Sequence, residues 1–187
     1  MNNSVFDHFP NLETDRLRLR RLGVDDIPMV FDFNADHEAL RYVPRAPYVH
    51  LDEAVEKVAG FIKGFRDRNG IWWAFVLKNS NEAIGYGGLF DIDAECSKAE
   101  IGYGLLKPFW RQGYASEIVS EMTRFAVEQA NLHRVYGLVD PENTPSAKVL
   151  LKLGFQHEGC LHHDIFARGQ YFDMDVFGLI TPEASVL

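Results

Sequence analysis

Residues 111 to 114, Arg-Gln-Gly-Tyr, stand directly before a helical pattern and could bind a phosphate group. From Ala115 onward the apolar positions recur with the spacing of one helix face, which predicts a helix to about residue 131. The preceding residues supply no Ser, Thr, Asp or Asn at the N-cap position, so several backbone N–H groups lack partners. A phosphate would accept those hydrogen bonds and suit the positive end of the helix dipole. Taken alone, the stretch fits a helix end hydrated by water at least as well.

A second group of polar residues suggests a metal site. His162 and His163 lie near three acidic residues, Asp164, Asp173 and Asp175. The segment reads as a strand, in which adjacent side chains point to opposite faces of a sheet. The two histidines therefore cannot easily bind one ion, and we expect no metal here.

The elements that position the loop follow from hydrophobic periodicity. Apolar and small residues alternate over 99–106, which predicts a strand that ends before Pro108. Similar patterns predict further strands at 16–22, 71–77, 83–90, 133–139, from 155 onward, and 171–180, and helices at 25–35, 51–68, 115–131 and 145–153. This order predicts an α+β fold, a mixed, mostly antiparallel sheet of about seven strands flanked by about four helices.

Apolar stripes predict which helix faces are buried. The helix at 51–68 is expected to bury Leu51, Val55, Val58, Ile62 and Phe65. The helix at 145–153 is expected to bury Ala147, Leu150 and Leu151. Residues 12–181 are expected to form a single domain between a loose N-terminal tail, 1–11, and a short C-terminal tail, 182–187.

Composition narrows the class of function. The formal net charge of −8 argues against nucleic acid as a partner and would attract a basic substrate. No apolar run reaches membrane-spanning length, and the first residues do not form a signal peptide. The two cysteines, Cys96 and Cys160, form neither a metal-ligand spacing nor a disulfide framework, which is typical of a reducing compartment. We therefore expect a cytoplasmic protein without membrane contacts.

Separated stretches of the chain, in the right order, resemble the GNAT superfamily of N-acetyltransferases, and within it the RimJ/RimL branch of ribosomal-protein N-terminal acetyltransferases. The resemblance covers about residues 12 to 180. It rests on 12–20, on 99–103 with 110–117, on 143–146 with 151–155, and on 158–161 with 171–173. One residue departs from the pattern: Trp110 stands where the superfamily usually has Gln or Arg, although Gly113 and Ala115 fit.

The resemblance implies that acetyl-CoA is the cosubstrate. Its pyrophosphate would lie on backbone N–H groups of the loop, where Gly113 permits a close approach or a positive φ. Its pantetheine arm would pair with backbone groups at the end of the strand before the loop, like an added strand. The implied cofactor-binding residues are Tyr103, Leu105, Leu106, Arg111, Gln112, Gly113, Tyr114, Ala115, Ser116 and Asn143.

The resemblance also implies roles in catalysis. Glu100 matches the glutamate that takes the proton of the amine in some members, and Ser146 matches the residue that protonates the leaving thiolate in the ribosomal branch. A glutamate paired with an arginine, and a helix-start serine bonded to its own backbone, are the structural alternatives. A backbone N–H near Leu105 or Leu106 would stabilise the oxyanion. Asn143 would touch the pantetheine arm, with a plain N-cap as the alternative.

The implied activity is transfer of an acetyl group from acetyl-CoA to a primary amine. An α-amine, with a pKa of about 8, loses its proton more easily than a lysine near 10.4, so we expect the N-terminus of a protein or peptide, and a basic one suits the acidic surface. The alternatives are a small amine (a polyamine, amino acid or antibiotic) and a CoA-binding module without catalysis. A dinucleotide site is excluded, because one glycine stands where three are needed. The chain is expected to be a monomer or a homodimer.

Overall fold

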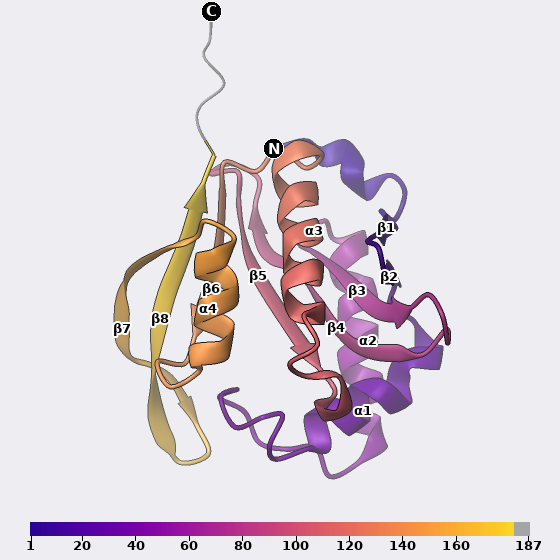
Figure 1. Ribbon diagram of the computed structural model, residues 1–187, viewed down its shortest axis with the longest axis vertical. Helices are drawn as coiled ribbons and strands as arrows, with labels where there is room; N and C mark the ends of the chain where they lie inside the picture. The colour runs from indigo at the N-terminus through magenta and orange to yellow at the C-terminus, as the bar shows by residue number, and fades with distance from the viewer. Residues whose placement is uncertain (182–187) are drawn as a thin grey trace, which may run out of the picture.

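An eight-stranded sheet forms the centre of the molecule (Figure 1), in the order β1-β2-β3-β4-β5-β6-β8-β7. The computed structural model describes residues 1–181, and the C-terminal tail expected at 182–187 lies outside the described residues. The strands are β1 Leu12–Glu13, β2 Leu17–Arg21, β3 Gly70–Leu77, β4 Ala83–Asp93, β5 Lys98–Leu105, β6 Arg134–Val139, β7 Gln156–Ala167 and β8 Gln170–Ile180. The sheet has one strand more than predicted, because the two residues of β1 are too few to produce a periodic pattern.

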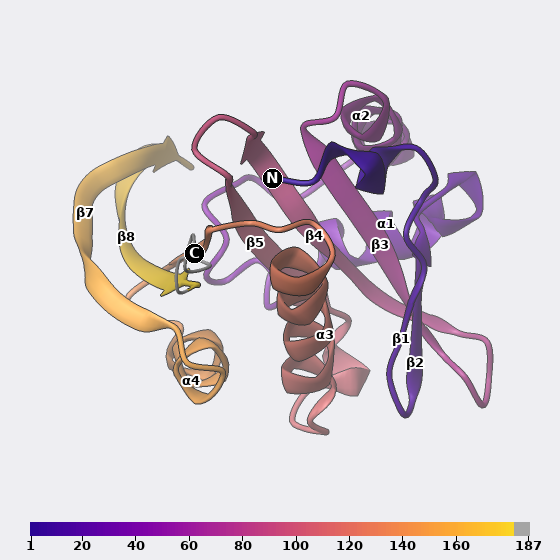
Figure 2. The same cartoon turned by 90° about the horizontal axis from the view of Figure 1, so that it is seen from above.

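Four helices cover the sheet, as predicted: α1 Ile27–Ala35, α2 Leu51–Arg66, α3 Tyr114–Glu128 and α4 Thr144–Lys152. Seen from above, α3 and α4 lie on one side of the sheet and α1 and α2 on the other (Figure 2). Short 3-10 turns occupy Asn3–Phe6, Val24–Asp26 and Lys107–Phe109. Within residues 1–181, no helix combines the length and the apolar content needed to cross a bilayer.

Each face of the sheet has its own hydrophobic core. The core under α3 and α4 contains the fully buried Trp73 and Phe125, whose rings meet edge to face 5.5 Å apart. The core under α1 and α2 contains Val58 and Phe61, and the ring of Phe61 stacks on Trp72 at 4.1 Å. The neighbours Trp72 and Trp73 therefore serve different cores, because successive strand side chains point to opposite faces.

The N-terminal segment, expected as a loose tail, is packed against the core. The Phe6 side chain is 7% exposed and lies 5.4 Å from the ring of Phe65. The indole N–H of Trp73 donates a hydrogen bond to the carbonyl oxygen of Pro10. The prediction was wrong here because a short 3-10 turn with one buried aromatic residue leaves no periodic signal.

Two helices bury different faces from those predicted. In α2 the buried residues are Ala54, Val58 and Phe61, while Leu51 and Val55 are exposed by 51% and 42%. The buried face of α2 is therefore rotated about the helix axis from the predicted face, toward Trp72, on which the ring of Phe61 stacks. In α4, Leu150 is buried as predicted but Leu151 is 52% exposed. Each helix has more apolar residues than its sheet contact can cover, so periodicity alone could not choose among them.

The feature that positions the site is the separation of β5 from β6. These two strands are the only parallel neighbours among the described residues, and they pair only over Lys98–Glu100 and Arg134–Tyr136. Beyond Glu100 the strands part, whereas β4 and β5 stay paired as far as Leu105. The second half of β5 thus lacks a neighbouring strand on its β6 side. The helix α3 follows β5, and α4 follows β6, so both helix starts lie near this separation.

Candidate active site

The loop before α3 has the backbone conformation expected of an anion-binding turn. Gly113 is the N-cap residue, with a φ of 82° in the left-handed region, and no side chain caps the helix start in the described part of the chain. Arg111 also has a positive φ, 59°. The first N–H of the helix with a partner in the chain is that of Glu117, which donates to the Gly113 carbonyl oxygen at 3.2 Å. The N–H groups that precede it, including those of Tyr114, Ala115 and Ser116, are available to an external acceptor such as a phosphate.

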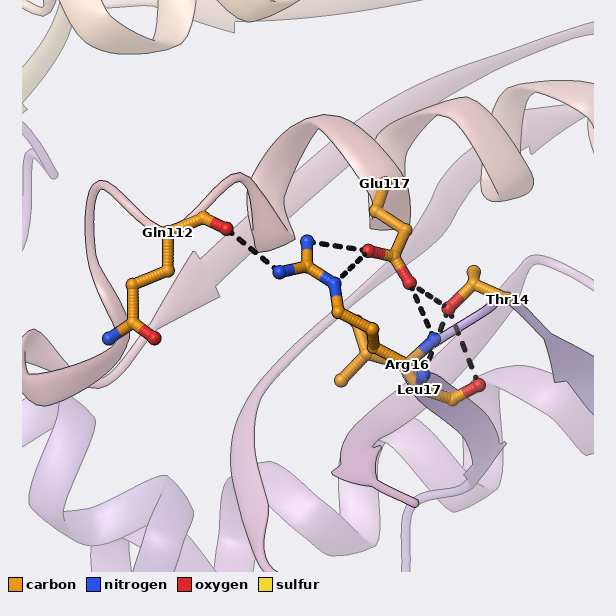
Figure 3. Close-up of polar contacts among 5 residues, drawn as sticks. All are labelled: Thr14, Arg16, Leu17, Gln112 and Glu117. Carbon is orange, nitrogen blue, oxygen red and sulfur yellow. Dashed lines mark hydrogen bonds and ion pairs between the residues drawn. The ribbon is translucent and has the colours of Figure 1, made fainter. Parts of the chain in front are cut away.

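A polar network fixes this loop against the start of β2 (Figure 3). The Arg16 guanidinium donates to the Gln112 carbonyl oxygen at 3.0 Å and to the Glu117 carboxylate at 2.7 Å. The same carboxylate accepts hydrogen bonds from the Thr14 hydroxyl and from the Arg16 backbone N–H. The guanidinium also lies 4.2 Å from the ring centroid of Tyr114. Arg16 therefore contacts the chain before Gly113, at Gln112, and after it, at Tyr114 and Glu117.

Burial raises the pKa of Glu117, but the hydrogen bonds from Thr14 and Arg16 outweigh it, so the pKa lies below its ordinary value. The carboxylate is therefore charged at neutral pH. Sequence patterns did not single out Arg16 or Thr14 for this contact, because 101 residues separate Arg16 from Glu117. In the sequence, Arg16 falls in the stretch 12–20 and Glu117 in the stretch 110–117, and nothing in either stretch indicates that the two side chains form an ion pair.

The end of β5 offers fewer free backbone groups than predicted. The Leu106 N–H donates to the Ile84 carbonyl oxygen at 2.9 Å, and the Leu106 carbonyl oxygen accepts from the Phe109 N–H. The Leu105 carbonyl oxygen accepts from the indole N–H of Trp110 at 2.7 Å. The Leu106 N–H and carbonyl oxygen are therefore bonded within the chain, which favours Leu105 over Leu106 as the predicted oxyanion donor. The N–H and carbonyl groups of Tyr103 and the N–H of Leu105 remain on the side of β5 away from β4, because Gly104 and Leu106 bond toward β4 in the alternating ladder.

Trp110, which departs from the superfamily pattern, has a side-chain role of its own. Its indole is half-buried and ties the loop back to the last residue of β5. This bond holds the loop against the end of β5.

A hydrogen bond between hydroxyl groups spans the separation of the strands. Tyr103, on β5, and Ser146, in the first turn of α4, are 2.8 Å apart at their side-chain oxygens. Burial raises the pKa of Tyr103 to about 12, and the hydrogen bond to Ser146 opposes the shift. The Ser146 hydroxyl is therefore bonded to a neighbouring element. Asn143 is the N-cap of α4, because its side-chain oxygen accepts from the Ser146 N–H at 3.2 Å.

Glu100 lies on the opposite face of β5 from Tyr103, because three residues separate them on a strand. Its cross-strand neighbours are Phe90 on β4 and Tyr136 on β6. Burial, together with the nearby carboxylates of Asp91 and Asp164, raises the pKa of Glu100 to about 7. No arginine pairs with Glu100 in the described part of the chain. A carboxyl group that titrates near neutrality can accept a proton from an amine.

A cavity of about 620 Å³ opens at the carboxyl end of β6. Its walls come from the connection between α1 and α2, the β6–α4 loop and the turn between β7 and β8. They include Arg41 and Arg168, the acidic Asp140 and Glu142, and the segment 170–173. Because the β6–α4 loop leads directly into the helix that holds Ser146, the cavity lies beside the separation of β5 and β6.

These features define the class of protein as an N-acyltransferase that takes its acyl group from a CoA thioester. The chain belongs to the GNAT acetyltransferase family, because the family model described as acetyltransferase (GNAT) domain matches residues 16–156. It is therefore an acetyl-CoA-dependent N-acetyltransferase, with an amine as acceptor.

Known proteins similar to this chain include a Bacillus subtilis relative called uncharacterized N-acetyltransferase YoaA. It is 31% identical over 174 residues, which cover 93% of this chain and 98% of the relative. Spermidine N(1)-acetyltransferase of Escherichia coli is 26% identical, over 83% of this chain and 81% of that protein. Among solved structures, RimL, a ribosomal L7/L12 α-N-protein acetyltransferase in complex with coenzyme A, matches with a TM-score of 0.81 and 22% identity. That match covers 91% of this chain and 98% of RimL.

Proposed function

We propose that this enzyme acetylates the N-terminal α-amine of a protein or peptide, with Glu100 as the base and Ser146 as the acid. The observation that carries the proposal is the placement of both groups around β5 where this strand parts from β6. Glu100 lies on one face, and Tyr103 reaches Ser146 from the other. An acyl group in the separation would have a proton acceptor on one side and a proton donor on the other.

The chemistry needs a neutral amine. Glu100, with a pKa of about 7, takes the proton from the ammonium group, whose pKa is about 8 for an α-amine. The two values are close, so the transfer costs little free energy, whereas a lysine or polyamine near 10.4 costs about 3 kcal/mol more. The amine nitrogen then forms a bond to the thioester carbon. The bond between carbon and sulfur breaks as Ser146 gives its proton to the leaving sulfur, and the second proton that the nitrogen loses restores the serine hydroxyl, which Tyr103 holds in place.

The loop and the edge of β5 would hold the cosubstrate. The backbone N–H groups of Arg111 to Ser116 bind the pyrophosphate, with Gly113 giving the left-handed turn. Gln112 contributes through its backbone, since its side chain donates to the Pro108 carbonyl oxygen. The pantetheine arm lies against Tyr103 and Leu105, near Asn143. Acetyl-CoA supplies the activated acetyl group, and these residues orient it.

The cavity beside the β6–α4 loop would admit the acceptor. Its walls carry both signs of charge, from Arg41 and Arg168 and from Asp140 and Glu142. Mixed charges together with the aromatic residues Tyr171 and Phe172 suit a peptide, which has both donors and acceptors along its backbone. A fully cationic polyamine would meet the two arginines. The side of the site near Glu100 is acidic, because Asp91 and Asp164 lie there, and it favours the positive end of the acceptor.

The test is a panel of acceptors, with the acetylated product measured by mass spectrometry, because Cys96 and Cys160 are free thiols that would disturb a thiol reagent. A peptide with a free α-amine should have a higher kcat/KM than the same peptide with a blocked N-terminus and a free lysine. Ser146→Ala should lower kcat by about 10²-fold or more and leave the KM for acetyl-CoA nearly unchanged. A preference for the blocked peptide, or full activity of Ser146→Ala, would contradict the proposal.

A polyamine is the second candidate acceptor, favoured by the carboxylates of Asp91 and Asp164 near Glu100 and by the spermidine acetyltransferase among the relatives. Comparing the kcat/KM for spermidine with that for the free α-amine peptide in the same panel decides between a polyamine and a peptide as the acceptor. We also propose a cytoplasmic location, in keeping with the two free thiols.

A further inference from the structure

The hairpin of β7 and β8 carries a group of metal-ligating atoms that includes none of the proposed catalytic residues. The Cys160 Sγ lies 3.9 Å from the His162 Nδ1, which lies 2.9 Å from the Asp173 carboxylate. All three ligand atoms lie within 4.8 Å of one another. The three residues belong to two adjacent antiparallel strands, so the hairpin itself holds them together.

An irregularity in the strand pairing creates this group. Leu161 pairs with Met174, and the next pair is Ile165 with Phe172, so three residues of β7 lie opposite the single residue Asp173. His163, in the middle of the three, has a positive φ of 55°, and its N–H donates to the Asp173 carboxylate at 2.8 Å. The chain therefore turns around this carboxylate, and His162 reaches the other oxygen.

We propose that Cys160, His162 and Asp173 bind a Zn²⁺ ion, with water at the fourth position. Tetrahedral zinc with these ligands has edges of about 3.3 Å between nitrogen and oxygen and about 3.6 Å between nitrogen and sulfur. Two of the three observed separations, 2.9 Å from nitrogen to oxygen and 3.9 Å from nitrogen to sulfur, lie within about 0.5 Å of these values, and the third, from sulfur to oxygen, is no more than 4.8 Å. Side-chain rotations alone can close such a difference.

The chemistry of the three ligands selects the metal. A thiolate, an imidazole and a carboxylate together suit zinc, whereas calcium and magnesium prefer oxygen ligands alone. A thiolate and a carboxylate also balance the two positive charges of the ion. Asp175, which is the cross-strand neighbour of Cys160, lies 3.1 Å from His157 and adds a second carboxylate beside the ligands. The His162 side chain is 78% exposed, so an ion can enter from solution.

The acetyl transfer needs no metal, so the proposed ion takes no part in it, although Asp164, one of the carboxylates near Glu100, lies in the same irregular part of β7. Asp173 nevertheless also lines the cavity at the end of β6, so an ion here would fix one wall of that cavity. Binding would also close the irregular part of β7 against β8. We therefore expect the metal to stabilise the hairpin.

The test uses the full chain, freed of metal by a chelator and kept reduced without thiols, titrated with Co²⁺ as a spectroscopic substitute for Zn²⁺. The expected result is one Co²⁺ per chain, with the d–d bands of tetrahedral cobalt and a thiolate charge-transfer band, both removed by added Zn²⁺. Cys160→Ser should abolish the charge-transfer band, and His162→Ala should weaken binding by about tenfold or more. Zn²⁺ should raise the Tm of the unchanged protein and not that of Cys160→Ser.

Two matched variants are the controls. Cys96→Ser removes the other thiol, which is exposed in the loop between β4 and β5, and His163→Ala removes the adjacent imidazole, which stacks on Tyr171. Both should retain the spectrum and the affinity. The proposal is overturned if the unchanged protein gives no charge-transfer band, or if the band survives Cys160→Ser, or if it is lost in Cys96→Ser. Circular dichroism of each variant confirms that its fold is intact.

Discussion

Glu100 combines burial with two neighbouring carboxylates, and both raise its pKa to about 7. A carboxyl group of ordinary pKa would be charged at neutrality but would be a weak base. The environment thus converts a common side chain into a base suited to an amine. Its row on the sheet, between Phe90 and Tyr136, supplies the apolar surroundings that cause the shift.

Glu100→Gln should change the pH dependence of the rate. The wild-type kcat/KM with a peptide acceptor should rise with pH as Glu100 ionises near 7 and fall as the free acceptor amine loses, near 8, the proton that Glu100 takes. The variant should lose the first ionisation and about 10²-fold in rate. Asp91→Asn is the matched control: with one like charge removed, the Glu100 ionisation should move to lower pH while most of the rate remains. An unchanged profile in Glu100→Gln would remove it as the base.

The same residue predicts a pH-dependent stability. The pKa of Glu100 is about 7 in the folded state against 4.5 for an unperturbed carboxyl, so the folded chain keeps this proton at pH values where the unfolded chain has lost it. The contribution of this group to the free energy of unfolding therefore falls as pH rises from about 4.5 to about 7. Glu100→Gln cannot ionise, so its Tm relative to the wild type should be higher at pH 8 than at pH 5. Equal differences at the two pH values would mean that the carboxyl is not perturbed.

The site residues also show which features can be predicted from the sequence and which cannot. The motifs placed Gly113, Ser146 and Glu100 correctly on their elements, because strand and helix periods and turn residues are local properties. The pairing of Leu106 with Ile84, and of Arg16 with Glu117, depends on which segments meet in space. No local pattern carries that information.

At the scale of elements, the turn into α3 should tolerate no side chain at Gly113. Its φ is 82°, and a Cβ there would lie 3.4 Å from the Arg16 guanidinium. Gly113→Trp should cost about 1 to 2 kcal/mol of stability from the left-handed backbone and raise the Kd for acetyl-CoA at least tenfold, as calorimetry would measure. Gly169→Trp is the control, since Gly169 has a φ of 74° in the β7–β8 turn with open space around it. Gly169→Trp should lose similar stability but keep the wild-type Kd for acetyl-CoA. Equal Kd values in the two variants would exclude the loop before α3 as the binding site for acetyl-CoA.

The Arg16–Glu117 contact links β2 to α3 and predicts a separate effect on binding. Arg16→Ala should raise the Kd for acetyl-CoA about three- to tenfold, because the loop must then be ordered during binding. Glu117→Gln should give a similar loss, since the same contact is broken from the other side. Arg18→Ala is the control, because Arg18 bonds the Asn81 side chain. A normal Kd in Glu117→Gln together with a raised one in Arg16→Ala would show that the guanidinium acts directly on the ligand.

The irregularity in β7 shows why the metal ligands could not be found from the sequence. Alternation correctly separates the adjacent residues His162 and His163, and no metal was expected for that reason. The three residues opposite Asp173 break the two-residue period, and this brings His162 together with Cys160 and Asp173. A bulge of this kind has no dependable sequence signal, so ligand sets that depend on one need coordinates.

The molecule as a whole is one sheet with a hydrophobic core on each face, and β5 and β6 pair over only three residues each. The order of elements and the α+β class follow from the sequence, since strong periodic patterns specify them. The packing of the N-terminal segment does not, because one buried aromatic residue in a 3-10 turn has no period. This segment closes the core under α3 through Phe6, and it lies apart from α4, the helix that contains Ser146 (Figure 1).

Phe6→Ala should therefore reduce stability without changing the chemistry. The side chain is 7% exposed and packs against Phe65, so its removal should lower the free energy of unfolding by about 3 to 4 kcal/mol in a denaturant titration. Val24→Ala is the control, because Val24 is 68% exposed and its loss should cost less than about 0.5 kcal/mol. The kcat of Phe6→Ala should equal that of the wild type at temperatures well below its Tm. A loss of less than about 1 kcal/mol would mean that the segment is as loose as its sequence suggests.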